Sequence, residues 1–371
     1  MKAGLLLQNE RVCRTVYREP EAAYDGDSRP SIGRREFVRR SIQLGLLPPA
    51  AGAILAGCQR CGSPSEGTSG DEADRITIRF VGAVMNNPFW DQIQRGAESA
   101  GADLSDVILN YVAPDEFSHA NISALIKSTV AARPNGIAID YRGRMFEAVT
   151  QQALDKGCAV QFYNNYKGTE SSDSRIVRLA KTAVGLDKYQ AALRSAELFL
   201  PALKSDDPIV LFNGLPDSPE HLEIQTAYLK VLKDAGWSDE NIEVFPVTLD
   251  PAENYQLMKT YLAAHPTTAG IICWDSVTGS AAARAKSEAG MNIPTMAWNL
   301  DRTIMRAITD GSLNLTLTQQ PFLQGYYAVT ALYMKLKYNF IDPPVVDPAT
   351  LLVTRENINE VEELYAAGIA G

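Results

Sequence analysis

The chain has 371 residues, which is room for about two domains, and 46% of them are hydrophobic, as in a globular protein. Its formal net charge of −9 argues against a nucleic-acid partner, because such proteins present a basic face. The three histidines, at 119, 221 and 265, lack the spacing of a metal site or of a histidine-assisted nucleophile. We therefore expect no metal, no other cofactor and no catalytic residues.

The amino-terminal residues 1–57 have the features of an export signal. Gly33–Arg39, with the sequence GRREFVR, resembles a twin-arginine export signal. The weakly apolar segment 41–56 follows, which is too short and too broken by Gly and Pro to span a bilayer. It ends in Leu55-Ala56-Gly57-Cys58, which resembles a bacterial lipobox with Cys58 as the lipid acceptor.

Removal of residues 1–57 leaves 371 − 57 = 314 residues. The removed part carries nine basic and six acidic side chains, a net charge of 9 − 6 = +3, so the remainder carries −12. Acyl chains on Cys58 would hold this chain on a membrane outside the cytoplasm, either in the periplasm or at the outer cell surface. Residues 58–75 are low in apolar side chains and are expected to be a flexible linker.

Residues 76–101 are expected to form the first strand–loop–helix unit. Ile76 to Val84 is rich in buried β-branched residues, and the pattern breaks at Asn86-Asn87-Pro88 before a helical pattern starts at Phe89. In open α/β sheets, ligands bind beyond the carboxyl ends of the strands, which is where Asn87, Phe89 and Trp90 would lie. Two aromatic rings beside an amide suit a sugar, although the rings could equally fasten the helix to the core.

The same alternation of strand and helix continues with short connections, which is typical of a parallel doubly wound sheet. In the first half we expect strands at 107–111, 136–140 and 159–163, and helices at 122–132 and 145–157. The alternation restarts with strands at 209–212, 242–245, 270–274 and 295–298, and helices at 220–235, 255–264 and 279–289. Cys158 and Cys273 each stand alone at the edge of an apolar strand, so we expect small buried side chains rather than disulfides.

Polar residues gather at one kind of position in these elements. Each lies at or just past the carboxyl end of an expected strand: Asn87, Asp140, Asn164, Asn165, Asp275, Asn299 and Asp301. Any one of them could be an Asx turn or a helix cap. Because all share the same placement, and two sheets facing each other would bring them together, they predict a binding site.

Taken together, the chain resembles a periplasmic sugar-binding protein of the ribose/galactose type (type I), the solute receptor of a bacterial ABC importer. The resemblance covers about 76–353, and its marks are NNPFW at 86–90, the segments 265–290 and 307–329 with QQPFLQG at 319–325, and the strand at 350–353. It implies an α/β fold of two Rossmann-like, flavodoxin-like lobes with parallel sheets. The implied lobes are 76–183 plus 319–342 and 184–318 plus 343–355, with crossovers near Val184, Thr318 and Pro343 and a tail at 356–371.

The resemblance also implies ligand contacts and partners. The implied contacts fall on Asn87, Phe89, Trp90, Asp140, Asn164, Asn165, Asp275, Asn299 and Gln319, with Glu220 and Asp301 as neighbouring candidates. The ligand would be a carbohydrate or polyol, the protein partner an ABC transporter permease, and the receptor a monomer. Receptors of this type often carry an Asp-Arg pair where this chain has Asn164-Asn165, and another Arg near Leu222. Because an amide cannot reproduce the donor fork of Arg, the ligand is expected to differ from plain ribose.

Two alternatives remain open from the sequence. The same fold could signal to a chemoreceptor or a histidine kinase instead of a permease, which the sequence alone does not distinguish. An enzyme using Asp140 and Asp275 as an acid/base pair would need two carboxyl groups at a fixed spacing with different pKa values. No further catalytic constellation accompanies these two acids, so binding for import is the favoured function, without an enzyme activity.

Overall fold

The computed structural model describes residues 75–165, 171–204, 207–340 and 345–370. The expected export signal, the lipid acceptor Cys58 and most of the expected linker lie outside these residues. Within them, every strand expected from the sequence is present and differs from its expected bounds by a few residues at most. The described residues contain no helix with the length and hydropathy needed to cross a membrane.

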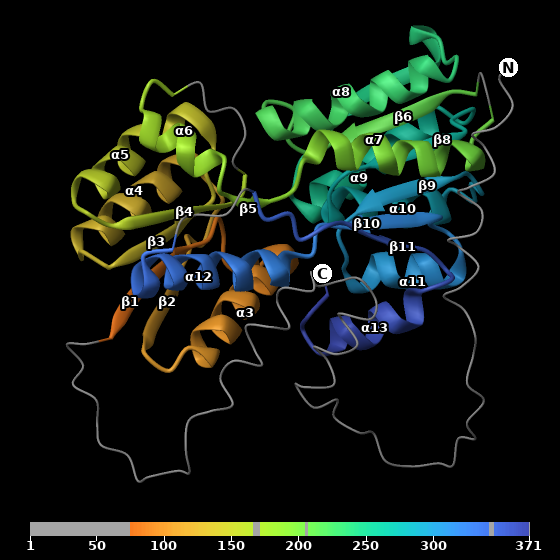
Figure 1. Ribbon diagram of the computed structural model, residues 1–371. Coiled ribbons are helices and arrows are strands. Elements are labelled where there is room, and N and C mark those ends of the chain that lie inside the picture. The colour runs from red at the N-terminus through yellow and green to blue at the C-terminus, as the bar shows by residue number, and fades with distance from the viewer. Residues whose placement is uncertain (1–74, 166–170, 205–206, 341–344, 371) are drawn as a thin grey trace, which may run out of the picture. The chain divides into compact units, whose positions relative to one another are not determined.

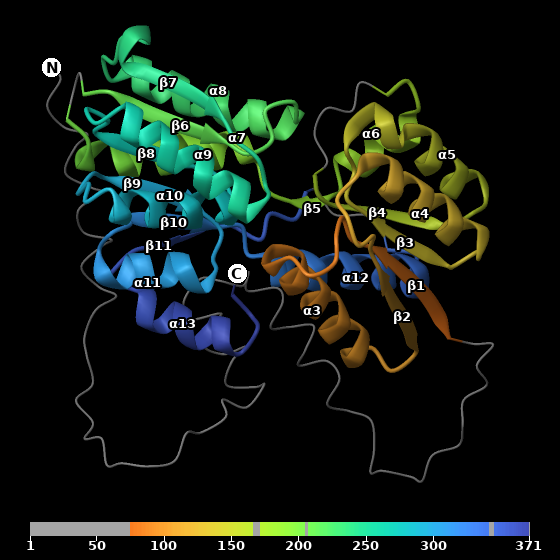
Figure 2. The same cartoon turned by 180° about the vertical axis from the view of Figure 1, so that it is seen from behind.

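The first sheet has five parallel strands in the order β2-β1-β3-β4-β5 (Figure 1). Its strands are β1 (Ile76–Val81), β2 (Val107–Val112), β3 (Gly136–Ile139), β4 (Ala159–Asn164) and β5 (Val184–Gly185). Its helices are α3 (Pro88–Asp103), α4 (His119–Ala131), η3 (Gly143–Phe146), α5 (Glu147–Asp155), α6 (Ser174–Ala180) and α12 (Pro321–Tyr338). Helix α12 packs along α3, and α4 packs along α5 on the opposite face of the sheet, so both faces are covered (Figure 2).

The second sheet has six strands in the order β11-β10-β9-β8-β6-β7, and only β11 is antiparallel to its neighbour. Its strands are β6 (Ile209–Asn213), β7 (Ile242–Pro246), β8 (Gly270–Cys273), β9 (Thr295–Trp298), β10 (Leu315–Thr318) and β11 (Leu351–Val353). Its helices are α7 (Lys188–Phe199), η4 (Leu200–Ala202), α8 (Pro219–Asp234), η5 (Asp239–Asn241), α9 (Pro251–Ala264), α10 (Ser276–Glu288), α11 (Arg302–Asp310) and α13 (Ile358–Ala366). Helices α7 and α8 pack together, and α9 packs on α10.

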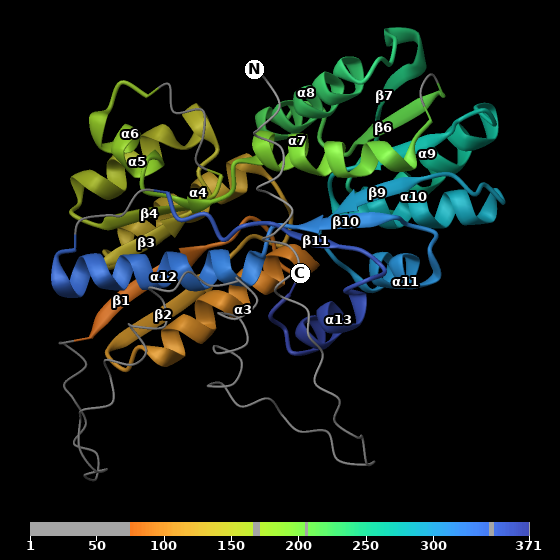
Figure 3. The same cartoon turned by 45° about the vertical axis from the view of Figure 1, so that its right-hand side comes forward.

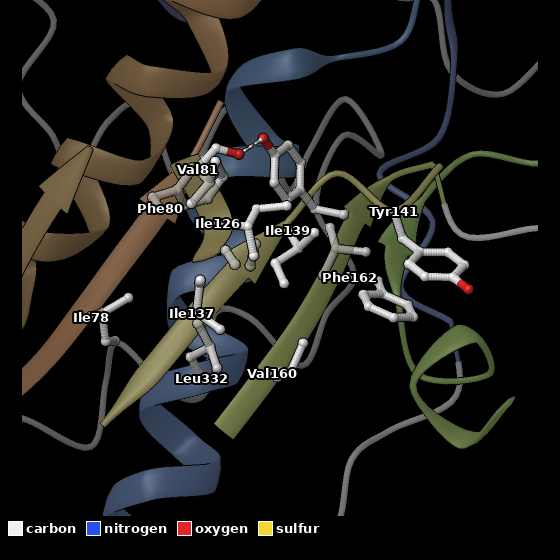
Figure 4. Packing of buried hydrophobic residues seen from close by; sticks show 14 of the residues in the cluster. Ile78, Phe80, Val81, Ile126, Ile137, Ile139, Tyr141, Val160, Phe162 and Leu332 are labelled. Atoms are coloured by element: carbon white, nitrogen blue, oxygen red, sulfur yellow. Dashed lines mark hydrogen bonds between the residues drawn. The ribbon is translucent and has the colours of Figure 1, made fainter. Parts of the chain in front are cut away.

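Each sheet has its own hydrophobic core, as continuous β-branched and aromatic strands buried on both faces require. In the first core, Ile78, Phe80 and Ile137 are fully buried and belong to the same cluster as Leu332 of α12 (Figure 4). A tyrosine hydroxyl crosses this core: Tyr163 donates to the carbonyl of Val81 at 2.7 Å. Cys158 and Cys273 are buried, unpaired thiols, which confirms the expectation from the sequence.

Two glycines allow α3 and α12 to approach closely. A Cβ at Gly96 would lie 1.9 Å from the carbonyl oxygen of Phe322, and a Cβ at Gly325 would lie 2.0 Å from that of Ile93. Backbone therefore packs on backbone at both positions, where no other residue fits. This contact positions the first turns of α12, which begins two residues after the candidate ligand residue Gln319.

The chain passes between the two sheets after β5, after β10 and again between α12 and β11 (Figure 3). Two observations bear on the expected lobe boundaries. Val184 and Gly185 pair with β4, and Val346 bridges to Val184, so both segments belong to the first sheet and not to the second. The expected tail contains a helix, α13, whose Ile358 and Val361 are buried in an apolar cluster with residues of α11. The expected crossover at Pro343 lies outside the described residues.

Candidate functional site

Three of the expected site residues meet at the carboxyl ends of β3 and β4. Asp140 follows β3 and is almost fully buried, and its Oδ1 accepts from Asn165 Nδ2 at 2.8 Å and from Asn164 Nδ2 at 3.4 Å. Asn164 has a φ of +57°, a conformation that Asn tolerates better than most residues, and this turns the chain at the strand end. Parallel neighbouring strands thus bring one carboxylate and two amides together.

Arg142 completes this group and extends it to the second half of the chain. Its guanidinium binds Asp140 Oδ2 through Nη2 at 2.6 Å and Nε at 2.8 Å, and Nη1 binds Glu220 Oε1 at 3.0 Å. Glu220 lies in the first turn of α8. Between the two polar residues, Tyr141 turns to the core and stacks on Phe162 (Figure 4). Asp140 and Arg142 therefore face the same polar side.

A second connection between the two halves comes from Lys188. This buried lysine begins α7, and its ammonium donates to Asn165 Oδ1. The cluster defined by Asp140, Arg142, Asn165, Lys188 and Glu220, which we call the polar cluster, therefore contains two cations and two carboxylates. Because these charges balance, the polar cluster is suited to a neutral ligand rather than to an ion.

The environment of the polar cluster shifts the pKa values of its two carboxyl groups in opposite directions. Burial raises the pKa of Asp140, and Arg142 opposes this rise. Burial also acts to raise the pKa of Glu220, but Arg142 and Lys188 outweigh it and lower that pKa to about 2. Burial lowers the pKa of Lys188, against the pull of the two carboxylates. Glu220 is thus the carboxylate that stays ionised most firmly.

Two more expected site residues meet on the second sheet. Asn299 follows β9 with a φ of +62°, and its Oδ1 accepts from Gln319 Nε2 at 3.1 Å, just past β10. Both side chains are buried. This pair therefore occupies the carboxyl ends of neighbouring strands, a placement that the strand pattern predicted for Asn299, whereas Gln319 was implied only by the resemblance.

Unpartnered acceptors mark both parts of the site. Among the described residues, seven buried side-chain atoms have no hydrogen-bond partner, and two of them are Asn164 Oδ1 and Gln319 Oε1. Leaving a buried acceptor without a donor costs about 1–3 kcal/mol, so such atoms call for an explanation. Asn164 is the last residue of β4 in the first sheet, and Gln319 directly follows β10 in the second. A ligand with several hydroxyl groups could satisfy both.

Three expected site residues act as helix caps. Asn87 accepts from the backbone N–H of Phe89 at the start of α3, Asp275 accepts from that of Thr278 in α10, and Asp301 accepts from that of Ile304 in α11. Burial raises the pKa of Asp275 to about 6, although Thr278 opposes the shift through two hydrogen bonds. Helix capping thus accounts for the position of these residues at strand ends.

The aromatic pair at the start of α3 is divided between core and surface. Trp90 is only 7% exposed and belongs to the first core, where its ring lies edge-on to Tyr163. Phe89 is half-buried and meets Trp90 in a T-shaped contact with ring centroids 5.3 Å apart. Packing therefore accounts for most of the Trp90 side chain, and Phe89 is the more accessible of the two rings.

His221, next to Glu220, forms a second buried group. Its Nδ1 lies 2.9 Å from Trp274 Nε1 and 3.1 Å from Asn213 Oδ1. Burial lowers the pKa of His221 to about 4, so the ring is neutral, and its Nδ1 accepts from the tryptophan, which can only donate. Trp274 immediately precedes Asp275, which connects the capped end of α10 to the Glu220 end of α8.

Arg142 and Lys188 join this candidate site, and the sequence analysis named neither of them. Arg142 stands two residues after Asp140, a spacing that the sequence contained, but its partner Glu220 lies 78 positions away. Three of its five N–H groups are used by Asp140 and Glu220, which leaves two donors for a ligand. A guanidinium therefore lies in the polar cluster, although at neither of the two positions where receptors of this type often carry one.

The described residues contain no group of three or more His, Cys, Asp or Glu side chains that could bind a metal ion. Asp140 is paired with Arg142, and Asp275 is bound to Thr278, so each carboxylate of the alternative acid/base pair has a partner of its own. Neither observation favours that alternative.

Comparisons with known proteins agree with this architecture. The family described as "Periplasmic binding protein domain" matches residues 78–339. The Xylose/arabinose-binding protein XylF of Sulfolobus acidocaldarius is 22% identical over 292 residues, covering 76% of this chain and 71% of its own.

Similar solved structures include ABC transporter solute-binding proteins. One from Agrobacterium vitis with bound D-fucose has a TM-score of 0.69 at 16% identity, covering 80% of this chain and 100% of its own. One from Burkholderia graminis with D-arabinose has a TM-score of 0.67 at 22% identity, covering 77% of this chain and 97% of its own. A carbohydrate transporter from Acidothermus cellulolyticus with myo-inositol has a TM-score of 0.68 at 19% identity, covering 80% of this chain and 99% of its own. With its two mostly parallel sheets and the family match over most of its length, the chain belongs to the periplasmic binding protein domain family.

Proposed function

We propose that this protein is an extracytoplasmic receptor that binds a neutral sugar or polyol and delivers it to an ABC importer. The observation that carries the proposal is the pair of buried, unpartnered acceptors, Asn164 Oδ1 and Gln319 Oε1, which lie at strand ends of different sheets. Hydroxyl groups donate to such acceptors, and a carbohydrate carries several of them. The charge-balanced polar cluster beside Asn164 supports a neutral ligand. The relatives named above, described with sugars or an inositol, support the same class.

The mechanism requires binding and release without chemical change, so we propose no enzyme activity. The polar cluster joins residues of the first sheet to the first turns of α7 and α8, through Arg142–Glu220 and Asn165–Lys188. A ligand that contacts both sheets would favour the form in which they are held together, and closure would then be a population shift. Asp140, Asn164, Asn165, Asn299 and Gln319 would bind hydroxyl groups, and Phe89 would cover a ring face.

The proposed location follows from the amino-terminal signals. Cys58 would carry the lipid anchor, a permease would be the protein partner, and the receptor would act as a monomer. An affinity in the micromolar to submicromolar range, roughly −8 to −10 kcal/mol, would allow both capture and release.

Isothermal titration calorimetry of the purified chain with D-xylose, D-arabinose, D-ribose, D-fucose and myo-inositol tests the proposal. We expect at least one of them to bind, and Gln319→Met to weaken that binding by roughly tenfold to a hundredfold, because one acceptor and one amide donor are lost. Asn254→Leu is the matched control, since Asn254 in α9 also has a buried, unpartnered Oδ1. No heat from any sugar, or equal weakening by both variants, would refute the proposal.

A further inference from the structure

An aromatic ring outside the set of expected site residues lies against the guanidinium of Arg142. The ring belongs to Phe117, in the segment between β2, which ends at Val112, and α4, which starts at His119. The Cζ atom of Arg142 lies 5.0 Å from the centroid of this ring. A guanidinium at this distance makes a cation–π contact, which is stronger when the pair is shielded from water. The side chain of Arg142 is only 6% exposed, so the contact is shielded.

Contacts with the first core hold the Phe117 ring in place. The side chain is half-buried and packs against the core cluster of the first sheet. His119 lies edge-on to it, with ring centroids 5.4 Å apart, and the same histidine lies edge-on to Phe146 at 6.3 Å. Phe146 itself is fully buried. Packing within the first half of the chain therefore sets the position of the Phe117 ring, and no ligand is needed for it.

Asp140 and Phe117 hold the same guanidinium from different directions. Asp140 Oδ2 accepts from Nε at 2.8 Å and contacts Nη2 at 2.6 Å, which fixes one edge of the group. The contact with the ring restrains rotation of the group about that edge. Glu220, the third partner, lies in α8 and belongs to the half of the chain that forms the second sheet. Arg142 is therefore held by residues of its own half even if the two halves move apart.

Two N–H donors of Arg142 remain for a ligand. Nη1 and Nη2 carry two N–H groups each, and Glu220 takes one from Nη1 while Asp140 takes one from Nη2. One donor is therefore left on each terminal nitrogen. Two donors on one guanidinium suit two oxygens that lie close together, as in its bidentate pairs with carboxylates. In a neutral sugar, hydroxyl groups on neighbouring carbons supply such a pair of oxygens.

We propose that Phe117 is a positioning residue of the ligand site, which holds Arg142 so that its two remaining donors bind two neighbouring hydroxyl groups of the sugar, an inference that rests on the proposed function. A guanidinium that is already held in place loses less conformational entropy when it binds. Phe117 would thus raise affinity without touching the ligand. Arg142 would be the group that recognises a vicinal diol.

Isothermal titration calorimetry with D-xylose, D-arabinose, D-ribose, D-fucose and myo-inositol measures the contribution of Phe117. Phe117→Leu and Phe117→Met both remove the ring and keep an apolar side chain, so one serves if the other fails to fold. We expect either variant to raise the Kd of each sugar that binds the parent chain by about threefold to thirtyfold. Phe117→Tyr keeps an aromatic ring and should stay within about twofold of the parent.

Tyr255→Leu is the matched control. It removes another ring that lies against a guanidinium, since Arg284 Cζ is 3.9 Å from the Tyr255 ring centroid. Tyr255 belongs to α9 and Arg284 to α10, and neither is a candidate ligand residue. The Kd of each sugar should therefore be the same for this variant as for the parent.

A double-mutant cycle separates positioning from a general loss of packing. Arg142→Lys keeps the positive charge beside Asp140 and Glu220 but removes the fork of donors that Phe117 positions. In the Arg142→Lys background, Phe117→Leu should raise the Kd further by no more than about twofold. Monodeoxy derivatives of the sugars that bind provide the chemical counterpart. Loss of either of two neighbouring hydroxyl groups should weaken binding to the parent more than binding to Phe117→Leu.

An unchanged Kd in both Phe117→Leu and Phe117→Met would overturn the role of Phe117 and leave the proposed function intact. The same holds for equal effects of Phe117→Leu in the two Arg142 backgrounds, which a purely structural role predicts. It also holds if every deoxy derivative is weakened equally in the parent and in Phe117→Leu. No heat from any sugar with the parent chain would refute the proposed function, and the role of Phe117 with it.

Discussion

Removing the guanidinium of Arg142 would test whether the polar cluster is a stabilising element of the native fold. Arg142→Met keeps much of the side-chain volume but takes away three charged hydrogen bonds, two to Asp140 and one to Glu220. Side chains of Asp140 and Arg142 are only 1% and 6% exposed, so water cannot replace the lost partner. Breaking a buried ion pair by removing one partner costs about 3–5 kcal/mol, and we expect the free energy of unfolding at pH 7 to fall by this amount.

Urea denaturation followed by circular dichroism measures this change, and Arg175→Met is the matched control. Arg175 also binds two carboxylates, Asp173 and Asp155, but its own side chain is 40% exposed and that of Asp155 is 65% exposed. Its removal should cost only a small fraction of the loss at Arg142. If the two variants lose equal stability, burial does not set the value of the ion pair and the reasoning is refuted.

The pH dependence of the Arg142→Met variant provides a second check. Burial already raises the pKa of Asp140, and without Arg142 only Lys188 remains as a nearby cation that opposes the rise. An acid whose pKa is raised on folding destabilises the native state when it is ionised, and protonation relieves this cost. The stability loss of the variant should therefore be largest at pH 7 and smaller near pH 4. A loss that is independent of pH would contradict this account.

Two further predictions concern individual residues. The pKa of Asp275 is raised to about 6 from an ordinary value of 3.8, so this group lowers the stability of the native state by about 2 kcal/mol as pH rises from 4 to 7. Unfolding of the wild type and of Asp275→Asn across this range should show that change in their difference, and a difference that is independent of pH would contradict it. Gly325→Ala should lower the free energy of unfolding by about 1–3 kcal/mol, because the new Cβ would meet the carbonyl oxygen of Ile93. Gly157→Ala is the control, since nothing lies within 4 Å of a Cβ there and only the φ of +78° is unfavourable. A loss at Gly325 no larger than that at Gly157 would refute close packing as its cause.

The strand ends were predictable because parallel strands buried on both faces have a clear signature. Continuous runs such as Ile137 to Ile139 indicate a buried strand, and a polar residue directly after such a run can only lie at the edge of the sheet. Asp140, Asn164 and Asn165 were predicted in this way, and the structure brings them together. The prediction needed only local pattern and the rule that parallel strands share a direction.

The roles of the same residue types could not be separated from the sequence. Asp140 and Asp275 both follow a buried strand, yet Asp140 binds Arg142 and Asp275 caps α10. A cap is recognised by the helix that begins after it, and the first turn of α10 was expected to start later, near Gly279, than it does. The small residues there carry a weak helical pattern, so the cap was not apparent.

By itself, the sequence determined that the chain forms two buried sheets of one type and that polar side chains stand at their edges, because periodicity and chain direction are local properties. Only the tertiary structure decided that Arg142 and Lys188 join the polar cluster of the candidate site, and that Trp90 belongs mainly to the core. Arg142 is 78 positions from its partner Glu220, and Lys188 is 23 positions from its partner Asn165. Lysine and arginine side chains are well hydrated at almost any surface position. Burial of one of them beside a particular carboxylate or amide therefore depends on packing between distant elements, which no local sequence pattern records.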